Sequence, residues 1–501
     1  MNKNSLTTAV IAGIAGVVGI ASMANAVNLN PDGLGQVLLY PYYTVNAGQQ
    51  TLLSVVNTTA VGKAVKVRFL EGYNSREVLD FNLFLSPFDV WTAGVFALND
   101  AGVSSNGAGI LTNDKSCTAP ALTESTTPGG QGYVAFRDFL FTGNYTDSGP
   151  STIDRTREGH FEMISMGDIT GATLAKDITH VNGVPPGCAK AEADFEAANF
   201  GAIVAPTSGL FGAASVVNVA NGTYYAYNAD AIDGFTATAL GSVTGSLSPS
   251  LGQANDVGGA TATSLVFLSG TLLTSQYAAP ANAIDAVSSI FSASNVYNEW
   301  QAAADGSVGS DWVVTFPTKR FYVDPLYVST TVLPPFEEVF GGLRCGATSC
   351  AYSDPGNSCV AIGVNLFDRE EQTTTNPGCT FSPCPPGQPG SAICKETNVI
   401  SFLANGTAPD ILGSNLRLNI KPLGTSGWMN LNLNAGPATH PHAMNPSING
   451  NVFNGLPVTG FEAVNFVNGN LGGVLANYSG VYRHREARNC TNAGGVGNVC
   501  S

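Results

Sequence analysis

Two histidines and a methionine lie close together near the C-terminal end of the chain. His440, His442 and Met444 occupy alternate positions in a His-Pro-His-Ala-Met segment. Alternate side chains of an extended chain point to the same side, and imidazole and thioether groups form a soft ligand set that suits copper. These three residues are therefore candidate metal ligands; the alternative is a polar loop with two incidental histidines.

Carboxylate pairs point to a different chemistry. Glycoside hydrolysis requires two Asp or Glu side chains across a cleft, without a fixed local motif. Asp368 and Glu370 would project to the same side of a strand, with Arg369 opposite, and Glu337 and Glu338 form a second dense pair. We take Asp368 and Glu370 as candidate catalytic residues. The alternative is a solvated strand end with ordinary surface charges.

Other catalytic and cofactor motifs are absent from the sequence. It contains no Gly-x-Ser-x-Gly nucleophile elbow, no His-Glu-x-x-His zinc motif and no phosphate loop ending in Gly-Lys-Ser/Thr. The net charge is −15. Because an acidic chain repels phosphate backbones, nucleic acid is not expected as a partner. A metal ion is the one cofactor that the sequence suggests.

The ten cysteines indicate a disulfide-bonded protein, because an even number in an exported chain predicts paired thiols. We expect Cys117 to pair with Cys188 and Cys490 to pair with Cys500. The six cysteines between them allow about 15 pairings, so their connectivity stays open. Zinc binding by two Cys-x4-Cys segments is the alternative. The full set is Cys117, Cys188, Cys345, Cys350, Cys359, Cys379, Cys384, Cys394, Cys490 and Cys500.

Residues 1–26 have the features of a bacterial signal peptide. Lys3 gives a positive start, an apolar run extends from Ala9 to Met23, and Ala24-Asn-Ala26 has the small-x-small pattern of a cleavage site. We expect cleavage after Ala26, with an uncleaved membrane anchor as the alternative. The predicted location is the cell surface or the medium, and the periplasm is the alternative.

Strand patterns dominate the rest of the chain. Segment 63–69 alternates apolar residues with Lys66 and Arg68, which predicts a strand with one face in a core and the other in water. Segments 415–421 and 428–434 repeat the pattern, with Leu, Ile and Met on the inward face. Further strands are predicted at 36–43, 51–56, 132–136, 215–219, 223–227, 311–316, 321–323, 360–367 and 463–467.

Two helices, at 189–200 and 281–293, are predicted to pack on the outside of a sheet. The predicted fold class is mainly β, with two or more antiparallel β-sandwich-like domains and a few short peripheral helices. Segment 27–335 is expected to form one or more β-rich domains with helical and loop insertions. Segment 336–501 is expected to form a cysteine-rich β domain.

These features favour a non-enzymatic function. Charged residues make up 11% of the chain and glycines number 58, so the surface is built from amides and hydroxyls. With disulfides, such a chain is typical of a structural or adhesive protein outside the cell. Exposed strand edges favour self-association or contact with cell-envelope components. The alternatives are a secreted carbohydrate-active hydrolase with paired carboxylates and a periplasmic metal-binding protein.

Overall fold

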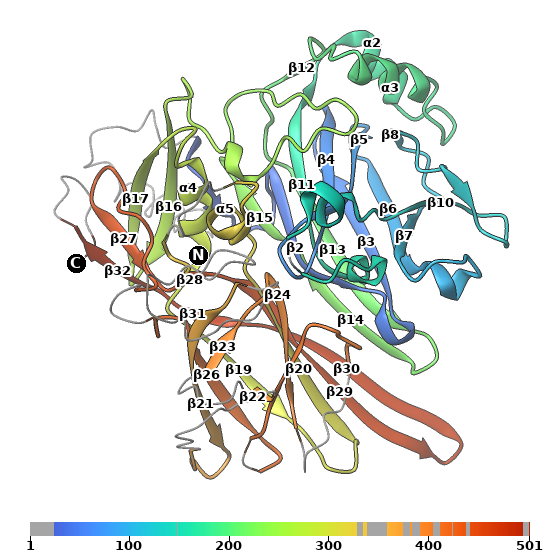
Figure 1. The fold of residues 1–501 in the computed structure, drawn as a ribbon. Coiled ribbons are helices and arrows are strands. Elements are labelled where there is room, and N and C mark those ends of the chain that lie inside the picture. The colour runs from blue at the N-terminus through green and yellow to red at the C-terminus, as the bar shows by residue number, and fades with distance from the viewer. Residues whose placement is uncertain are drawn as a thin grey trace, which may run out of the picture.

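The computed structural model of the protein describes residues 25–147, 149–327, 334–337, 358–373, 381–382, 391–403, 411–422, 424–436, 441–493 and 500. Four large sheets contain most of the described strands (Figure 1). All pairs of named strands are antiparallel except β24 with β25. The predicted mainly β fold with sandwich-like domains is therefore confirmed.

The first sheet has eight strands among the described residues, and the three at its centre are buried along their whole length. Both faces of this sheet are therefore covered by other parts of the chain. The central strands are β2 (Val37–Thr44), β11 (Glu158–Ile169) and β4 (Gly62–Glu71), and the others are β1 (Asn28–Leu29), β15 (Asp230–Asp233), β5 (Glu77–Leu85), β8 (Cys117–Ala119) and β12 (Ile203–Val204).

The second sheet packs on one face of the first and completes an N-terminal sandwich. Aromatic rings fill the space between them; the Phe69 and Phe161 rings stack with centroids 4.9 Å apart. Alternating burial along its strands leaves the outer face of this sheet in contact with water. In order across the sheet, its strands are β14 (Thr223–Asn228), β13 (Leu210–Asn218), β3 (Gln50–Asn57), β6 (Val90–Ala97), β7 (Ala108–Leu111), β10 (Gly132–Ala135) and β9 (Ser125–Thr126).

A C-terminal sandwich is built from two further sheets. Trp300, Trp312 and Phe402 pack between them, and the Trp300 and Phe402 rings stack 5.7 Å apart. One sheet contains β23 (Ser391–Ile393), β21 (Val360–Asp368), β26 (Ser426–Asn432), β19 (Asn295–Gln301) and β31 (Arg485–Ala487); the other contains β22 (Phe381–Ser382), β25 (Arg417–Ile420), β24 (Thr397–Phe402), β20 (Val308–Thr315), β29 (Thr459–Leu471) and β30 (Val474–Arg483).

The predicted boundary at 335/336 does not coincide with a division between sheets. β19 and β20 precede it in the chain, yet β19 pairs with β26 and β20 pairs with β24 and β29. Strands from both sides of residue 335 therefore form the same C-terminal sandwich. The chain enters this sandwich at about β19, directly after α4 (Ala283–Phe291).

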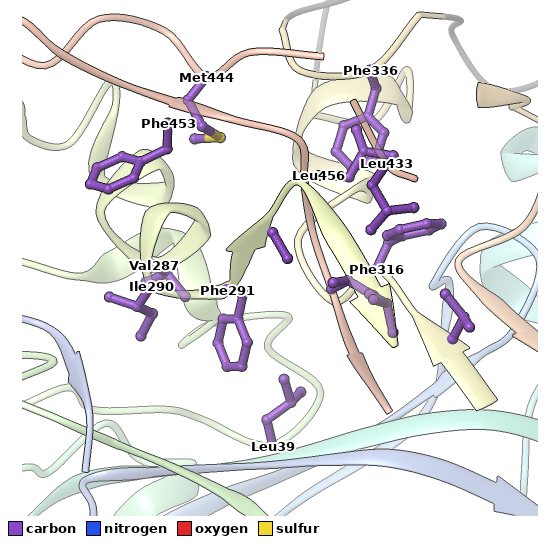
Figure 2. Close-up of a cluster of buried hydrophobic side chains, with 14 of the residues drawn as sticks. Leu39, Val287, Ile290, Phe291, Phe316, Phe336, Leu433, Met444, Phe453 and Leu456 are labelled. Carbon is purple, nitrogen blue, oxygen red and sulfur yellow. The ribbon is translucent and has the colours of Figure 1, made fainter. Parts of the chain in front are cut away.

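The helix α4 corrects the expectation that the helices lie on the outside of a sheet. Its side chains are buried almost all round, and Val287, Ile290 and Phe291 contribute to a hydrophobic cluster with Met444 and Phe453 (Figure 2). The helix can be buried because its polar side chains have partners within the core. It packs against the hairpin of β16 (Thr261–Leu268) and β17 (Thr271–Ala278) and against β28 (Leu456–Pro457). β28 pairs with β18 (Ser292–Ala293), and β27 (Asn451–Asn454), which contributes Phe453 to the cluster, pairs with β32 (Asn489–Asn492).

Strand β4 confirms the predicted alternation but not the predicted water-facing side. Lys66 and Arg68 are fully buried, although they lie on the polar face, and so is Lys63 at the start of the strand. Lys63 donates a 2.7 Å hydrogen bond to Asp168, and Lys66 pairs with Asp80. The charges are buried because each has an opposite charge beside it.

Segment 321–323 is not the strand that its apolar residues predict. It forms part of the short helix α5 (Arg320–Val323). A run of three apolar residues is too short for its periodicity to separate a strand from one helical turn. The other predicted strands are present, with ends that differ by a few residues.

Three disulfides join distant parts of the described chain. Cys117–Cys188 connects β8 to α3 (Cys188–Glu196), which packs beside α2 (Ala172–Ile178), and Cys490–Cys500 closes the C-terminal loop, so both predicted pairs are confirmed. Cys359–Cys394 settles one pair that the sequence left open. The other four cysteines, Cys345, Cys350, Cys379 and Cys384, lie outside the described residues.

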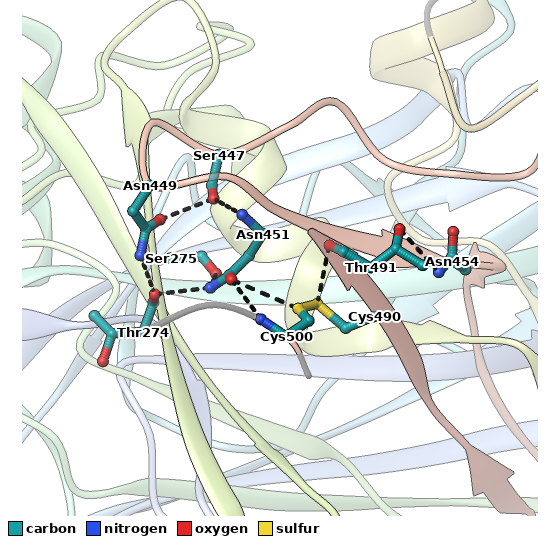
Figure 3. The surroundings of a disulfide bond; sticks show 9 residues. All are labelled: Thr274, Ser275, Ser447, Asn449, Asn451, Asn454, Cys490, Thr491 and Cys500. Carbon is teal, nitrogen blue, oxygen red and sulfur yellow. Dashed lines mark hydrogen bonds between the residues drawn. A yellow bond between two sulfur atoms is a disulfide. The ribbon is translucent and has the colours of Figure 1, made fainter. Parts of the chain in front are cut away.

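The C-terminal disulfide is anchored by a buried asparagine (Figure 3). Asn451 accepts a 3.1 Å hydrogen bond from the Cys500 amide and donates to Thr274 O and Ser275 Oγ of β17. The end of the chain is thereby fixed to the hairpin that covers α4.

Among the described residues, no helix has the length and apolar character needed to cross a bilayer.

Candidate functional site

The predicted metal ligands are only partly described, because His440 lies outside the described residues. The His442 ring is fully buried, with Nδ1 2.7 Å from Leu433 O and Nε2 2.6 Å from a carboxylate oxygen of Glu337. The Met444 side chain lies in the hydrophobic cluster around α4 (Figure 2). Both His442 nitrogens thus already face oxygen acceptors, and the described part of the chain contains no group of three metal-ligating side chains. A metal site here stays a prediction.

Of the predicted catalytic carboxylates, Asp368 ends β21 and Glu370 lies in the turn that follows it. Asp368 Oδ1 accepts hydrogen bonds from the backbone amides of Glu370 at 2.9 Å and Gln372 at 2.8 Å. The Glu370 residue is exposed. The structure therefore gives Asp368 a role in stabilising the turn, and catalysis by this pair also stays a prediction.

A buried ionic layer covers the face of the first sheet that points away from the second. Arg68 lies between two carboxylates, with Nε 2.5 Å from Glu77 and Nη1 2.5 Å from Glu162. Glu162 also accepts a 3.1 Å hydrogen bond from Arg320 of α5. Residues of β4, β5, β11 and α5 are thus linked by charges that have almost no contact with water.

A second part of the layer surrounds Arg155. Its guanidinium donates to both carboxylate oxygens of Glu71, at 2.7 and 2.8 Å, and to both of Asp147, at 2.6 and 2.8 Å. Arg76 pairs with Asp324, which follows α5, at 2.5 Å. Bidentate pairing of this kind fixes the relative orientation of the groups that it joins.

Burial raises the pKa values of several carboxylates in the layer, among them Glu77, Asp324 and Glu396. Burial raises the pKa of Glu396 to about 8, although the nearby Lys319 and a hydrogen bond from Ser75 oppose the shift. Glu396 precedes β24, whereas Ser75 lies in the turn between β4 and β5. The layer therefore connects the N-terminal sandwich to the C-terminal one, and we assign it a structural role.

A different polar site lies where the two sandwiches meet. We call it the inter-sandwich cleft; its volume is about 440 Å³. The seam beside it is held by the amide group of Asn477, which donates to Asn221 O at 3.1 Å, and by the backbone amide of Tyr224, which donates to Ser479 Oγ at 3.3 Å. The side chains that matter most for its chemistry are Thr223 and Tyr225 of β14, Asn465 of β29, Asn477 of β30, and Ile411 and Val467.

The cleft contains two polar atoms that lack a partner. Asn465 Oδ1 and Asn477 Oδ1 are shielded from water and have no hydrogen-bond donor in the described structure, whereas the Tyr225 hydroxyl is hydrogen-bonded with the side chains of Thr223 and Ser479. Thr223, Tyr225 and Asn465 are buried residues. Most buried polar groups in proteins are hydrogen-bonded, so these two amide oxygens mark the cleft as a candidate binding site.

Burial also fixes the protonation state of the cleft. It raises the pKa of the Tyr225 hydroxyl above its ordinary value, and the negative charge of Asp311 adds to the shift. Tyr225 therefore remains a neutral donor at physiological pH. None of the described residues around the cleft is charged. The site can bind a ligand by hydrogen bonds, but it offers no acid, base or nucleophile matched to catalysis near neutral pH.

No family model, curated protein or solved structure matches the chain. The evidence for function therefore comes from the cleft itself.

Sequence reasoning missed the cleft, because its side chains come from strands far apart in the chain. The Asn and Thr residues that line it resemble the many others in this sequence.

Proposed function

We propose that the protein is an exported, non-catalytic adhesive protein of the cell surface or extracellular medium, and that the inter-sandwich cleft holds its target. The observation that carries this proposal is the pair of shielded amide oxygens, on Asn465 and Asn477, that have no hydrogen-bond donor in the described structure. Leaving such atoms buried costs about 1–3 kcal/mol each. A preformed cleft with a few convergent polar groups is the usual form of a ligand site.

The surrounding frame supports a binding role. The cleft is bordered by β14 of the N-terminal sandwich and by β29 and β30 of the C-terminal one. The ionic layer and the shared hydrophobic clusters join these sandwiches elsewhere. A frame that holds the two walls in place lowers the ordering cost of binding. Three disulfides suit such a frame to an oxidising environment outside the cytoplasm.

The proposal is tested in a strain that lacks the protein and is complemented with the wild-type chain or a variant. Asn465→Ala removes one polar group of the cleft, and Asn434→Ala removes an exposed asparagine after β26 as the matched control. We expect the wild-type chain to be labelled on intact cells or recovered from the medium. Retention of cells on a coated surface under flow should fall in the strain that lacks the protein and in the strain that carries Asn465→Ala. It should stay at the wild-type level in the strain that carries Asn434→Ala.

Two results would contradict the proposal. One is recovery of the chain solely from the periplasm, because an adhesive protein must reach its target outside the cell. The other is unchanged retention in the strain that lacks the protein, tested on abiotic, polysaccharide-coated and protein-coated surfaces.

A further inference from the structure

We propose that the inter-sandwich cleft binds a neutral saccharide of one or two sugar rings. The inference rests on the proposed function for the choice of site, and it adds the chemical class of the ligand. It is argued from the hydrogen-bonding groups, the charge and the size of the cleft.

The hydrogen-bonding groups of the cleft match those of a sugar. A sugar hydroxyl both donates and accepts a hydrogen bond. Asn465 Oδ1 and Asn477 Oδ1 are acceptors without a donor in the described structure. The hydroxyls of Thr223 and Tyr225 interact with each other, and each has one donor and two acceptor sites, so both keep capacity for a further hydrogen bond. The orientation of Asn477 is set by its amide nitrogen, which already donates to Asn221. Its oxygen is therefore left for an incoming hydroxyl.

The charge of the site argues against an ionic ligand. The described lining offers no cation to pair with a carboxylate, sulfate or phosphate. The nearest electrostatic influence on Tyr225 is Asp311, a fully buried residue held by Ser401 at 2.5 Å and by the Leu412 amide at 3.0 Å. An anion near Tyr225 would be repelled by this carboxylate. An ammonium group would lose its hydration without gaining a direct ionic partner at the cleft surface.

The size and the apolar part of the cleft complete the match. A volume of about 440 Å³ is near the lower end of ligand sites in proteins, which span about 300–1,000 Å³. Ile411 and Val467 supply apolar surface beside the amides. Sugar rings present C–H groups between their hydroxyls, so this mixture of polar and apolar groups suits a ring. Gly306 and Gly309 add no side chain to the wall at the start of β20.

The test uses the purified protein and defined probes. Methyl glycosides of glucose, galactose, mannose and N-acetylglucosamine, with their neutral disaccharides, are screened by saturation-transfer NMR and titrated by calorimetry. Glucuronate and glucosamine are the charged probes. We expect at least one neutral probe to bind and both charged probes to bind at least tenfold more weakly. Tyr225→Phe should weaken binding about threefold to tenfold, the loss expected for one hydrogen bond.

Tyr277→Phe is the matched control for Tyr225→Phe. Tyr277 is also a buried tyrosine whose hydroxyl interacts with neighbouring hydroxyl groups, those of Ser264, Ser275 and Ser289, but it lies in the hydrophobic cluster around α4 and not at the cleft. Removing it should leave affinity unchanged. Circular dichroism and the midpoint of thermal unfolding check that both variants fold.

Three outcomes would overturn the inference: no neutral probe binds, a charged probe binds as well as the best neutral one, or Tyr225→Phe and Tyr277→Phe behave alike. In the first case the cleft holds only water. These outcomes are separate from a failure of the proposed function. Saccharide binding by a chain confined to the periplasm would leave the ligand class intact, whereas adhesion without saccharide binding would refute the ligand class alone.

Discussion

Substitution of Glu162 by Gln is the sharpest test of the buried ionic layer. The Glu162 side chain has no exposed surface, and one of its oxygens accepts hydrogen bonds from Arg68 at 2.5 Å and Arg320 at 3.1 Å. Gln keeps the shape and the acceptor but removes the charge. Arg68 would then keep Glu77 as its carboxylate partner, whereas Arg320 would lose the carboxylate to which it donates.

The expected magnitude follows from this geometry. Removing one partner of a buried ion pair costs about 3–5 kcal/mol. Because Gln can still accept one hydrogen bond, we expect Glu162→Gln to lower the free energy of unfolding by about 3 kcal/mol. That is a large share of the roughly 5–15 kcal/mol by which a typical protein is stable. Glu124→Gln is the control, since Glu124 and its partner Arg137 are 49% and 43% exposed. A surface pair contributes about 0–1 kcal/mol.

The assay is urea unfolding at pH 7 with the disulfides intact, followed by tryptophan fluorescence and circular dichroism. The slope of free energy against urea must be unchanged for the comparison to hold. A second variant, Glu162→Gln with Arg320→Met, removes the arginine that the first change leaves without its carboxylate. We expect it to be more stable than Glu162→Gln alone, which a double-mutant cycle measures. The reasoning is refuted if Glu162→Gln lowers the free energy of unfolding no more than Glu124→Gln does. It is also refuted if Arg320→Met lowers the free energy of unfolding as much in the Glu162→Gln variant as in the wild-type chain.

Three further predictions concern stability. Burial raises the pKa of Glu462 to about 8 from 4.5, so the folded protein binds an extra proton in this range and the free energy of unfolding falls as pH rises. Between pH 6.5 and 8, Glu462→Gln should flatten this fall by up to about 1.4 kcal/mol per pH unit in urea titrations. His160 and His484 are present in both proteins, so their contribution cancels in the comparison. Replacing Cys117 and Cys188 by Ala opens a 71-residue loop and should cost about 4 kcal/mol; an unchanged urea midpoint would contradict this. Gly460→Ala should lower the free energy of unfolding by about 3 kcal/mol and Gly472→Ala by about 1 kcal/mol in the same assay. Both glycines have a positive φ, but only a Cβ at position 460 would collide with a carbonyl oxygen of β20. Equal losses of stability in the two variants would contradict this, because they would show that the backbone around residue 460 moves to make room for the Cβ.

The sequence predicts the strands well because alternation is a local property. In β26, Met429 and Leu431 are buried and Asn430 and Asn432 are partly exposed, as their spacing predicts. The same reasoning predicts which residues of β4 share a face. It does not predict what covers that face, because Glu162 and Arg320 come from distant segments. The alternation predicted for β4 is therefore correct, and the error lies in the prediction that its polar face contacts water.

The cleft could not be predicted for a related reason. Thr223 and Asn465 belong to different sandwiches, and their meeting depends on how the two bodies pack. No local spacing encodes that arrangement. The disulfides are an intermediate case: the pairs at Cys117 and Cys490 followed from elimination, whereas Cys359 required the fold to select one partner among several.

The burial of basic residues also bears on the choice of ligand. Among the described residues, seven Lys and Arg side chains are buried: Lys63, Lys66, Arg68, Arg76, Arg155, Lys319 and Arg320. Each is part of the charged interior and is removed from the surface that a partner meets. The exposed surface is consequently poor in cations, in a chain that is already acidic. Such a surface repels anionic polymers at a distance, and amides and hydroxyls are plentiful on it. The cleft concentrates these groups at one place, which is why a neutral, hydroxyl-rich ligand fits the whole molecule as well as the site.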